Sequence, residues 1–142
     1  MKKILVINGP NINMLGKREP GIYGTESLEQ VNENLGRKAG ALGLEVDFYQ
    51  SNHEGDLVDR IQGLDGKYQG AILNAGAYTH TSLAIRDAVL SVRTPVVEVH
   101  LSNPHAREPY RWRSYLAGAA VGCVAGFGPR SYELALCWFA NG

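Results

Sequence analysis

Five short apolar runs alternate with helical patterns along the chain, and this alternation constrains the fold more than any other feature. The runs are mostly β-branched and bounded by Gly, Pro or Asn, as buried strands are; they cover residues 4–7, 44–49, 71–73, 96–99 and 119–125. Because right-handed crossovers need a helix between strands, the pattern predicts parallel pairing. We expect an α/β, flavodoxin-like doubly wound sandwich with a five-stranded parallel sheet in the order 2-1-3-4-5.

Four amphipathic helices are expected between and after these strands. Ser27, with Gln30 three residues later, has the spacing of a capping box and should begin the first helix, which Gly43 ends. A second apolar stripe, over 57–64, is closed by Gly66, and a third stops before a proline. A fourth helix is expected over residues 133–139.

Length, charge and cysteine content limit the classes of function. A chain of 142 residues has the size of one domain, spanning 1–142. Lys and Arg total 14, as do Asp and Glu, which disfavours a charge-driven binder of nucleic acid or anionic membrane. The sequence has neither a secretory nor a membrane-spanning apolar run, so we expect a cytoplasmic protein. Cys123 and Cys137 lack zinc-motif spacing and are expected to be buried thiols.

Two connections are longer than the usual ~2–6 residues and follow carboxyl ends of strands, where this fold binds its ligands. They cover residues 9–26 and 101–113. The first has the Asn and Gly content of a surface Ω-loop, but a mere turn would not require Arg18 and Tyr23. A guanidinium beside a phenol favours the phenolate and lowers a tyrosine pKa from its reference of about 10, so this pair predicts a base.

The third strand ends at Asn74, and His80 stands near the start of the following helix. Two interpretations fit this segment. In one, Thr79 or Thr81 caps the helix and His80 is solvated. In the other, Asn74 and His80 both face a polar ligand at the positive end of the helix. Asp87 follows His80 by seven residues, which on a continuous helix is two turns along the same face.

The fourth strand carries Glu98 and His100, which a period of two places on one face of the sheet. A carboxylate in a buried parallel strand needs a partner. Glu98 either orients the imidazole of His100 for general acid catalysis or forms a structural ion pair with Arg86 or Arg107.

Groups suited to a carboxylate ligand follow this strand. Leu101 and Ser102 offer a backbone amide and a hydroxyl, and Arg107 and Arg111, four apart, can share one helical face. The sequence has no Gly-x-Gly-x-x-Gly motif, Walker sequence or acidic metal cluster. The expected chemistry therefore uses acid, base and electrostatics alone, with no metal and no cofactor.

Three segments together resemble the type II 3-dehydroquinate dehydratase family, and the resemblance extends over nearly the whole chain. The segments are 8–24, 74–82 with Arg86-Asp87, and 98–103 with His105-Ala-Arg-Glu108. The resemblance implies a flavodoxin-like catalytic domain with an active-site lid over about 9–26. It also implies cofactor-free anti elimination of water from 3-dehydroquinate to 3-dehydroshikimate through an enolate, in the shikimate pathway. The implied assembly is a homododecamer, a tetramer of trimers.

The resemblance also implies residue roles. Tyr23 would remove the proton next to the ketone, and Arg18 would keep it ionised. His100 would protonate the departing hydroxyl with Glu98 beside it, and Asn11 would hold the water that stabilises the enolate. The substrate-binding residues would be Asn74, His80, Asp87, Leu101, Ser102 and Arg111, supported by Arg107.

A flavin- or phosphate-binding module on the same fold is the alternative. A flavin phosphate site favours a Ser/Thr-rich loop after the first strand, and a receiver domain requires an Asp at the end of the third. Here the first loop is rich in Asn and Gly, and the third strand ends at Asn74, so the enzyme is favoured.

Overall fold

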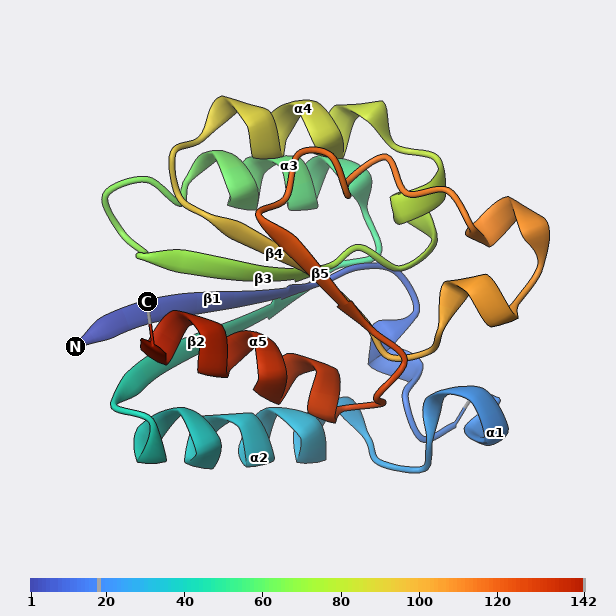
Figure 1. Ribbon diagram of the computed structural model, residues 1–142, viewed down its shortest axis with the longest axis horizontal. Helices are drawn as coiled ribbons and strands as arrows, with labels where there is room; N and C mark the ends of the chain where they lie inside the picture. Colours follow the sequence, from blue (N-terminus) through green and yellow to red (C-terminus); the bar gives the residue numbers. More distant parts are fainter. Residues whose placement is uncertain (18, 142) are drawn as a thin grey trace.

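The computed structural model describes residues 1–17 and 19–141, and its centre is a sheet of five strands (Figure 1). All neighbouring strands pair in parallel, in the order β2-β1-β3-β4-β5. The predicted architecture and strand order are confirmed. The strands are β1 (Lys2–Asn8), β2 (Leu44–Gln50), β3 (Gly70–Asn74), β4 (Val96–His100) and β5 (Gly122–Ala125).

Helices cover both faces of the sheet (Figure 1). One face carries α2 (Leu28–Ala41) and α5 (Arg130–Asn141), and the other carries α3 (Glu54–Gln62) and α4 (Leu83–Ser91). Alternate residues of each strand supply two buried apolar clusters, one on each face, because successive side chains of a strand point to opposite sides. The short helices are α1 (Pro20–Tyr23), η1 (Ile12–Met14), η2 (Gly76–His80), η3 (Pro104–Ala106) and η4 (Pro109–Arg111).

The helix boundaries follow local capping chemistry. Ser27 begins α2 with the predicted capping box, in which its hydroxyl accepts from Gln30 N–H at 3.2 Å and its own N–H donates to the Gln30 side chain at 2.9 Å. The cap of α4 is Ser82, so the interpretation in which Thr79 or Thr81 caps this helix is wrong. Helix α3 ends before Gly63, earlier than the predicted Gly66.

The fifth strand differs most from expectation. Residues 119–121 are apolar but lie in a turn, and β5 begins only at Gly122. The strand lies at an edge of the sheet, so it is not buried as predicted. Cys123 is exposed and Cys137 is half-buried, which corrects the expectation of two buried thiols.

A close backbone contact brings the loop after β1 against the end of β3. The Gly9 N–H donates to the Asn74 carbonyl at 2.8 Å. A Cβ atom on Gly9 would lie 2.5 Å from the Ala75 carbonyl oxygen, closer than side chains tolerate. Glycine is therefore required where the two strand ends meet.

None of the helices in the described part of the chain is long and apolar enough to cross a membrane.

Candidate active site

A cavity lies beyond the carboxyl ends of the central strands, where the doubly wound fold places its ligands. Segments far apart in the sequence meet there: the loop after β1, η2, the end of β4 and the η3–η4 segment, residues 104–111. Its walls include eight residues predicted for the site: Asn11, Asn74, His80, His100, Leu101, Ser102, Arg107 and Arg111.

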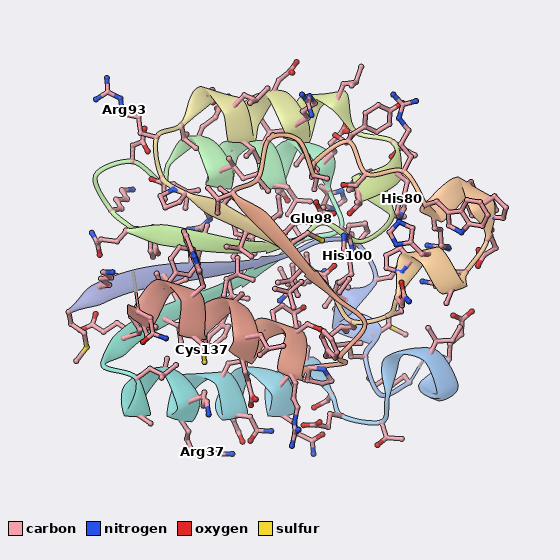
Figure 2. All side chains as sticks on the ribbon, in the orientation of Figure 1. Arg37, His80, Arg93, Glu98, His100 and Cys137 are labelled. Atoms are coloured by element: carbon pink, nitrogen blue, oxygen red, sulfur yellow. The ribbon has the colours of Figure 1, made fainter. Side chains whose placement is uncertain are left out.

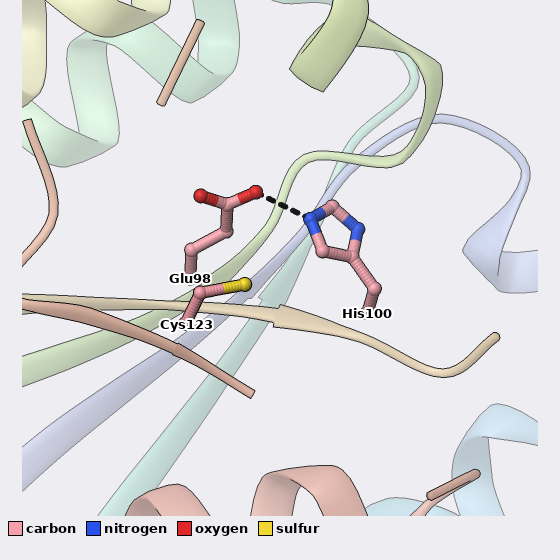
Figure 3. Close-up of side chains that lie close together, drawn as sticks. All are labelled: Glu98, His100 and Cys123. Carbon is pink, nitrogen blue, oxygen red and sulfur yellow. Dashed lines mark hydrogen bonds and ion pairs between the residues drawn. The ribbon is translucent and has the colours of Figure 1, made fainter. Parts of the chain in front are cut away.

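Glu98 and His100, which we call the β4 pair, lie on one face of β4 as predicted. Glu98 Oε2 is 2.5 Å from His100 Nε2, and the residues are 1% and 8% exposed (Figure 3). A carboxylate only accepts, so Nε2–H donates and Nδ1 lies on the side away from Glu98. The Ser114 hydroxyl also donates to Glu98 Oε2, at 2.8 Å. This geometry fixes the orientation of the imidazole at the cavity wall.

The proposed structural ion pair of Glu98 with Arg86 or Arg107 is not what the structure shows. The Arg86 guanidinium donates to the Tyr115 carbonyl at 2.8 Å. The Arg107 guanidinium donates to the Ser102 hydroxyl at 3.3 Å and lies 3.8 Å from a carboxylate oxygen of Glu108.

His80 lies beside His100 at the same end of the sheet (Figure 2). The two rings are stacked, with centroids 6.4 Å apart and planes 21° apart. His80 Nδ1 is 2.8 Å from the Arg113 carbonyl, so Nδ1–H donates and Nε2 remains an acceptor. Burial lowers the pKa of His80 below its ordinary value, and the neutral ring can accept a hydrogen bond from a ligand hydroxyl.

A buried chain of hydrogen bonds fixes the side chain of Asn74. The Asn74 amide donates to the Tyr132 hydroxyl at 2.9 Å, and that hydroxyl donates to Asn8 Oδ1 at 2.5 Å. Asn74 Oδ1 accepts from the Gly76 N–H at 3.2 Å. Burial raises the pKa of Tyr132, so its hydroxyl keeps the proton. The sequence did not predict the roles of Tyr132 and Asn8. Its one signal was that each residue carries a polar group beside an apolar run that was expected to be buried.

Two arginines reach the cavity from the η3–η4 segment. Arg107 and Arg111 do not share a helical face, because separate 3-10 helices begin at Pro104 and Pro109. Arg111 Nε–H donates to Glu108 at 2.9 Å. Hydrogen bonds from Tyr110 and then Arg111 lower the pKa of Glu108 to about 2, so this carboxylate stays charged near neutral pH.

The groups expected on the lid are described in part. Asn11 lines the cavity, has a left-handed backbone (φ 68°) and donates its N–H to Asn52 Oδ1 at 3.0 Å. Arg18 lies outside the described residues, and Tyr23 is described as the last residue of α1. The pairing of Arg18 with Tyr23 therefore stays a prediction.

Asp87 does not line the cavity. His80 ends η2, the chain then turns, and Asp87 lies on α4 with an exposed side chain. The expected alignment of the two residues on one helix is wrong because the helix begins only at Leu83. The role of Asp87 in substrate binding stays a prediction.

Within residues 1–17 and 19–141, one group of side chains has the composition of a metal site. Potential ligand atoms of Glu98, His100 and Cys123 all lie within 4.8 Å of one another (Figure 3). Sequence spacing did not indicate this group, because it depends on the β4–β5 register, which places Cys123 opposite Glu98. Burial, and then the charge of Glu98, raise the pKa of the Cys123 thiol to about 11.

The chain is similar to proteins of one family over almost its whole length. The family model described as dehydroquinase class II matches residues 2–140. A 3-dehydroquinate dehydratase of Synechococcus sp. (strain CC9902) is 58% identical over 133 residues, which cover 94% of this chain and 91% of that protein.

Solved structures agree with this result. The type II dehydroquinase from Butyrivibrio crossotus DSM 2876 is 43% identical, with a TM-score of 0.95 over 99% of this chain and 98% of that one. The type II dehydroquinase from Propionibacterium acnes is 38% identical, with a TM-score of 0.97 over 100% and 98% of the respective chains. These comparisons give no support to a flavin- or phosphate-binding module. Since the family model and the relatives both span nearly all of the sequence, this chain belongs to the class II dehydroquinase family.

Proposed function

We propose that this protein is a hydro-lyase, a 3-dehydroquinate dehydratase that acts in the shikimate pathway. The observation that carries the proposal is the buried β4 pair at the cavity wall, in a chain more than half identical to a protein of that name. The proposed reaction is an anti elimination of water from 3-dehydroquinate through an enolate.

The first step is removal of the proton next to the ketone. Tyr23 acts as the base, and Arg18 keeps the phenol ionised by its positive charge. Both residues belong to the segment of about 9–26 that is proposed to close over the substrate. Asn11, at the cavity wall, holds the water that stabilises the enolate oxygen.

The second step is departure of the hydroxyl. His100 Nδ1 is not used by the bond to Glu98, so its N–H can protonate the leaving oxygen when the ring carries both protons. Before this transfer, the Glu98 carboxylate stabilises the imidazolium and orients it, and donation of the proton then lowers the barrier in the transition state. Ser114 keeps Glu98 in place for this role.

Substrate hydroxyls and the carboxylate require donors and acceptors in fixed positions. Neutral His80 supplies an acceptor, while Ser102, the Leu101 amide and Arg111 supply donors for the carboxylate. Asn74 and Asp87 complete the proposed set, and Arg107 supports it through its bond to Ser102. None of these steps routes electrons or protons through a metal or an organic cofactor.

The assembly and location are also proposals. A cytoplasmic enzyme of twelve subunits, a tetramer of trimers, follows from the family resemblance. Large apolar side chains that are more than half exposed support association, among them Phe127 and, on α5, Trp138.

The direct test is to mix the purified protein with 3-dehydroquinate and follow the ultraviolet absorbance of the conjugated product. We expect absorbance to rise with wild-type protein and to persist after exhaustive chelation and dialysis. A His53→Ala variant is the control, because this exposed histidine does not line the cavity and its side chain makes no capping bond. Absence of product at any protein concentration would overturn the proposed activity.

A further inference from the structure

Cys123 lies next to the β4 pair but has no part in the proposed elimination. In the parallel register, Cys123 is opposite Glu98, and Ala125 is opposite His100. Register partners on adjacent strands direct their side chains to the same face of the sheet. The thiol therefore points to the side of the sheet that carries the carboxylate and the imidazole (Figure 3).

The three side chains have the chemistry of a zinc ligand set. Thiolate sulfur, imidazole nitrogen and carboxylate oxygen are the atoms that Zn²⁺ prefers. In a tetrahedral site with metal–ligand bonds of about 2.0–2.3 Å, ligand atoms lie about 3.3–3.8 Å apart. The ligand atoms of this group are all within 4.8 Å of one another, and rotation of the exposed cysteine brings its sulfur closer. Glu98 Oε2 and His100 Nε2, which are 2.5 Å apart with a proton between them, must separate by about 1 Å when the ion replaces that proton.

An unpartnered buried atom is a second, independent sign of a missing ligand. Glu98 is only 1% exposed, and its Oε1 atom has no hydrogen-bond partner among the described residues. A buried carboxylate oxygen without a donor is costly, and a cation held by both oxygens of Glu98 would satisfy it. Ser114 holds the other oxygen at 2.8 Å, as an outer-shell group orients a metal ligand.

We propose that Glu98, His100 and Cys123 bind one thiophilic divalent cation, Zn²⁺ in particular, and that the bound ion inhibits the enzyme. The ion enters from the exposed edge strand β5, at Cys123. On binding, the thiol proton leaves to the buffer and the ring keeps one proton, on Nδ1, while Nε2 binds the ion; carboxylate and thiolate together balance the two positive charges. The fourth position is open to water.

The inhibitory effect, unlike the binding, rests on the proposed dehydratase function. A cation on Nε2 replaces the proton that joins His100 to Glu98. The imidazole is then held in the neutral form that binds metals. It can no longer act as the imidazolium that protonates the leaving hydroxyl.

Cobalt substitution tests the binding independently of activity. Metal-free wild-type protein is titrated with Co²⁺, and the thiolate-to-cobalt charge-transfer absorption is followed in the near ultraviolet. We expect saturation at one Co²⁺ per chain and displacement of the band by Zn²⁺. Cys123→Ala should lack the band, while Cys137→Ala, which removes the other cysteine, should keep it. Failure of the wild type to develop the band, or its persistence in Cys123→Ala, would overturn the site.

Inhibition is measured as the Zn²⁺ concentration that halves the dehydratase rate, relative to each variant's own rate without metal. Loss of an outer-shell group typically weakens metal binding 10–100-fold, so loss of the thiol ligand itself should raise this concentration at least about 100-fold. Cys137→Ala should match the wild type. A wild-type rate that is unaffected by Zn²⁺ at concentrations that displace cobalt would overturn the inhibition. A protein without dehydratase activity that still binds Co²⁺ through Cys123 would overturn only the proposed function.

Discussion

The β4 pair and the η3–η4 segment face one cavity but are held there by different forces. Glu98 and His100 belong to a strand, are almost fully buried and are joined at 2.5 Å. Arg111 extends from a short 3-10 helix and is oriented by Glu108, a carboxylate on the exposed side of the segment.

This difference indicates that the β4 pair serves proton transfer and the η3–η4 segment serves substrate binding. A buried group on a strand is fixed by the sheet before substrate arrives, which suits a proton transfer that depends on geometry. A guanidinium on a short loop helix, oriented by a solvent-screened ion pair, suits recognition of a charged substrate. Changes in the β4 pair should therefore lower turnover, while changes in the η3–η4 segment should weaken binding.

The largest effect is expected from the proposed base, which belongs to neither region. A phenol with a reference pKa of about 10 is a poor base near neutral pH unless a cation such as Arg18 stabilises the phenolate. Tyr23→Phe should lower kcat by at least about 10²–10⁴-fold with little change in binding. Arg18→Ala should shift the basic-side ionisation in the pH–rate profile upward. If Tyr23→Phe retains more than about a tenth of wild-type turnover, another group is the base.

A smaller loss should follow from changing Glu98, which acts through His100. Glu98→Gln keeps the shape of the side chain but removes the charge that orients and stabilises the imidazolium. Misplacement of a catalytic group costs roughly 10²-fold, so we expect kcat to fall by about that factor while KM changes little. Ser114→Ala should lower kcat less than Glu98→Gln, since it removes only one hydrogen bond to the same carboxylate. A Glu98→Gln enzyme with raised KM and normal kcat would place the pair in binding instead.

For Arg111 we expect the reverse of the Glu98 result, with a change in KM and little change in kcat. A hydrogen bond to a charged group contributes about 1.5–3 kcal/mol, so Arg111→Ala should raise KM by roughly 10–100-fold and leave most of kcat. Steady-state kinetics over a range of substrate concentrations measure both constants. A loss confined to kcat would show that Arg111 acts in the transition state, and the comparison between the two regions would fail.

The smallest effect is expected from Glu108→Gln. The folded pKa of Glu108, about 2, lies below its ordinary value, so its stabilising contribution is present above about pH 4.5 and is lost as the pH falls toward 2. Because 41% of the Glu108 side chain is exposed to screening solvent, the contribution is small even at neutral pH. The urea midpoints of wild type and variant should therefore differ slightly at pH 7 and converge at pH 2. A difference that grows on acidification would contradict the assignment.

Much of this molecule is predictable from sequence because strand signals are local. β-branched runs and the Ser27 capping box predict most elements, and the period of two in β4 places Glu98 and His100 on one face. The edge strand is different. Residues 119–121 have strand-like composition but lie in a turn and bend before β5, because apolar composition alone does not determine where a strand begins.

The rest of the site depends on tertiary packing. Ser114 and Tyr132 reach the site residues Glu98 and Asn74 across 16 and 58 positions of sequence, and no local pattern indicates such contacts. The proximity of Cys123 to Glu98 likewise follows from strand register, which the sequence does not specify by spacing. The position of the site could still be predicted from the sequence, because the loops after the strands carry residues, such as Arg18 and Tyr23, that a turn alone would not need.

The central claim is that the β4 pair protonates the leaving hydroxyl in a step separate from proton removal. The most direct measurement uses His100→Ala in deuterated water, following both deuterium incorporation next to the ketone and product formation. The account predicts that elimination falls by about 10²–10⁴-fold while Tyr23 still forms the enolate, so that exchange outpaces product formation. Product formation at more than about a tenth of the wild-type rate would contradict it, because His100 would then not be the acid.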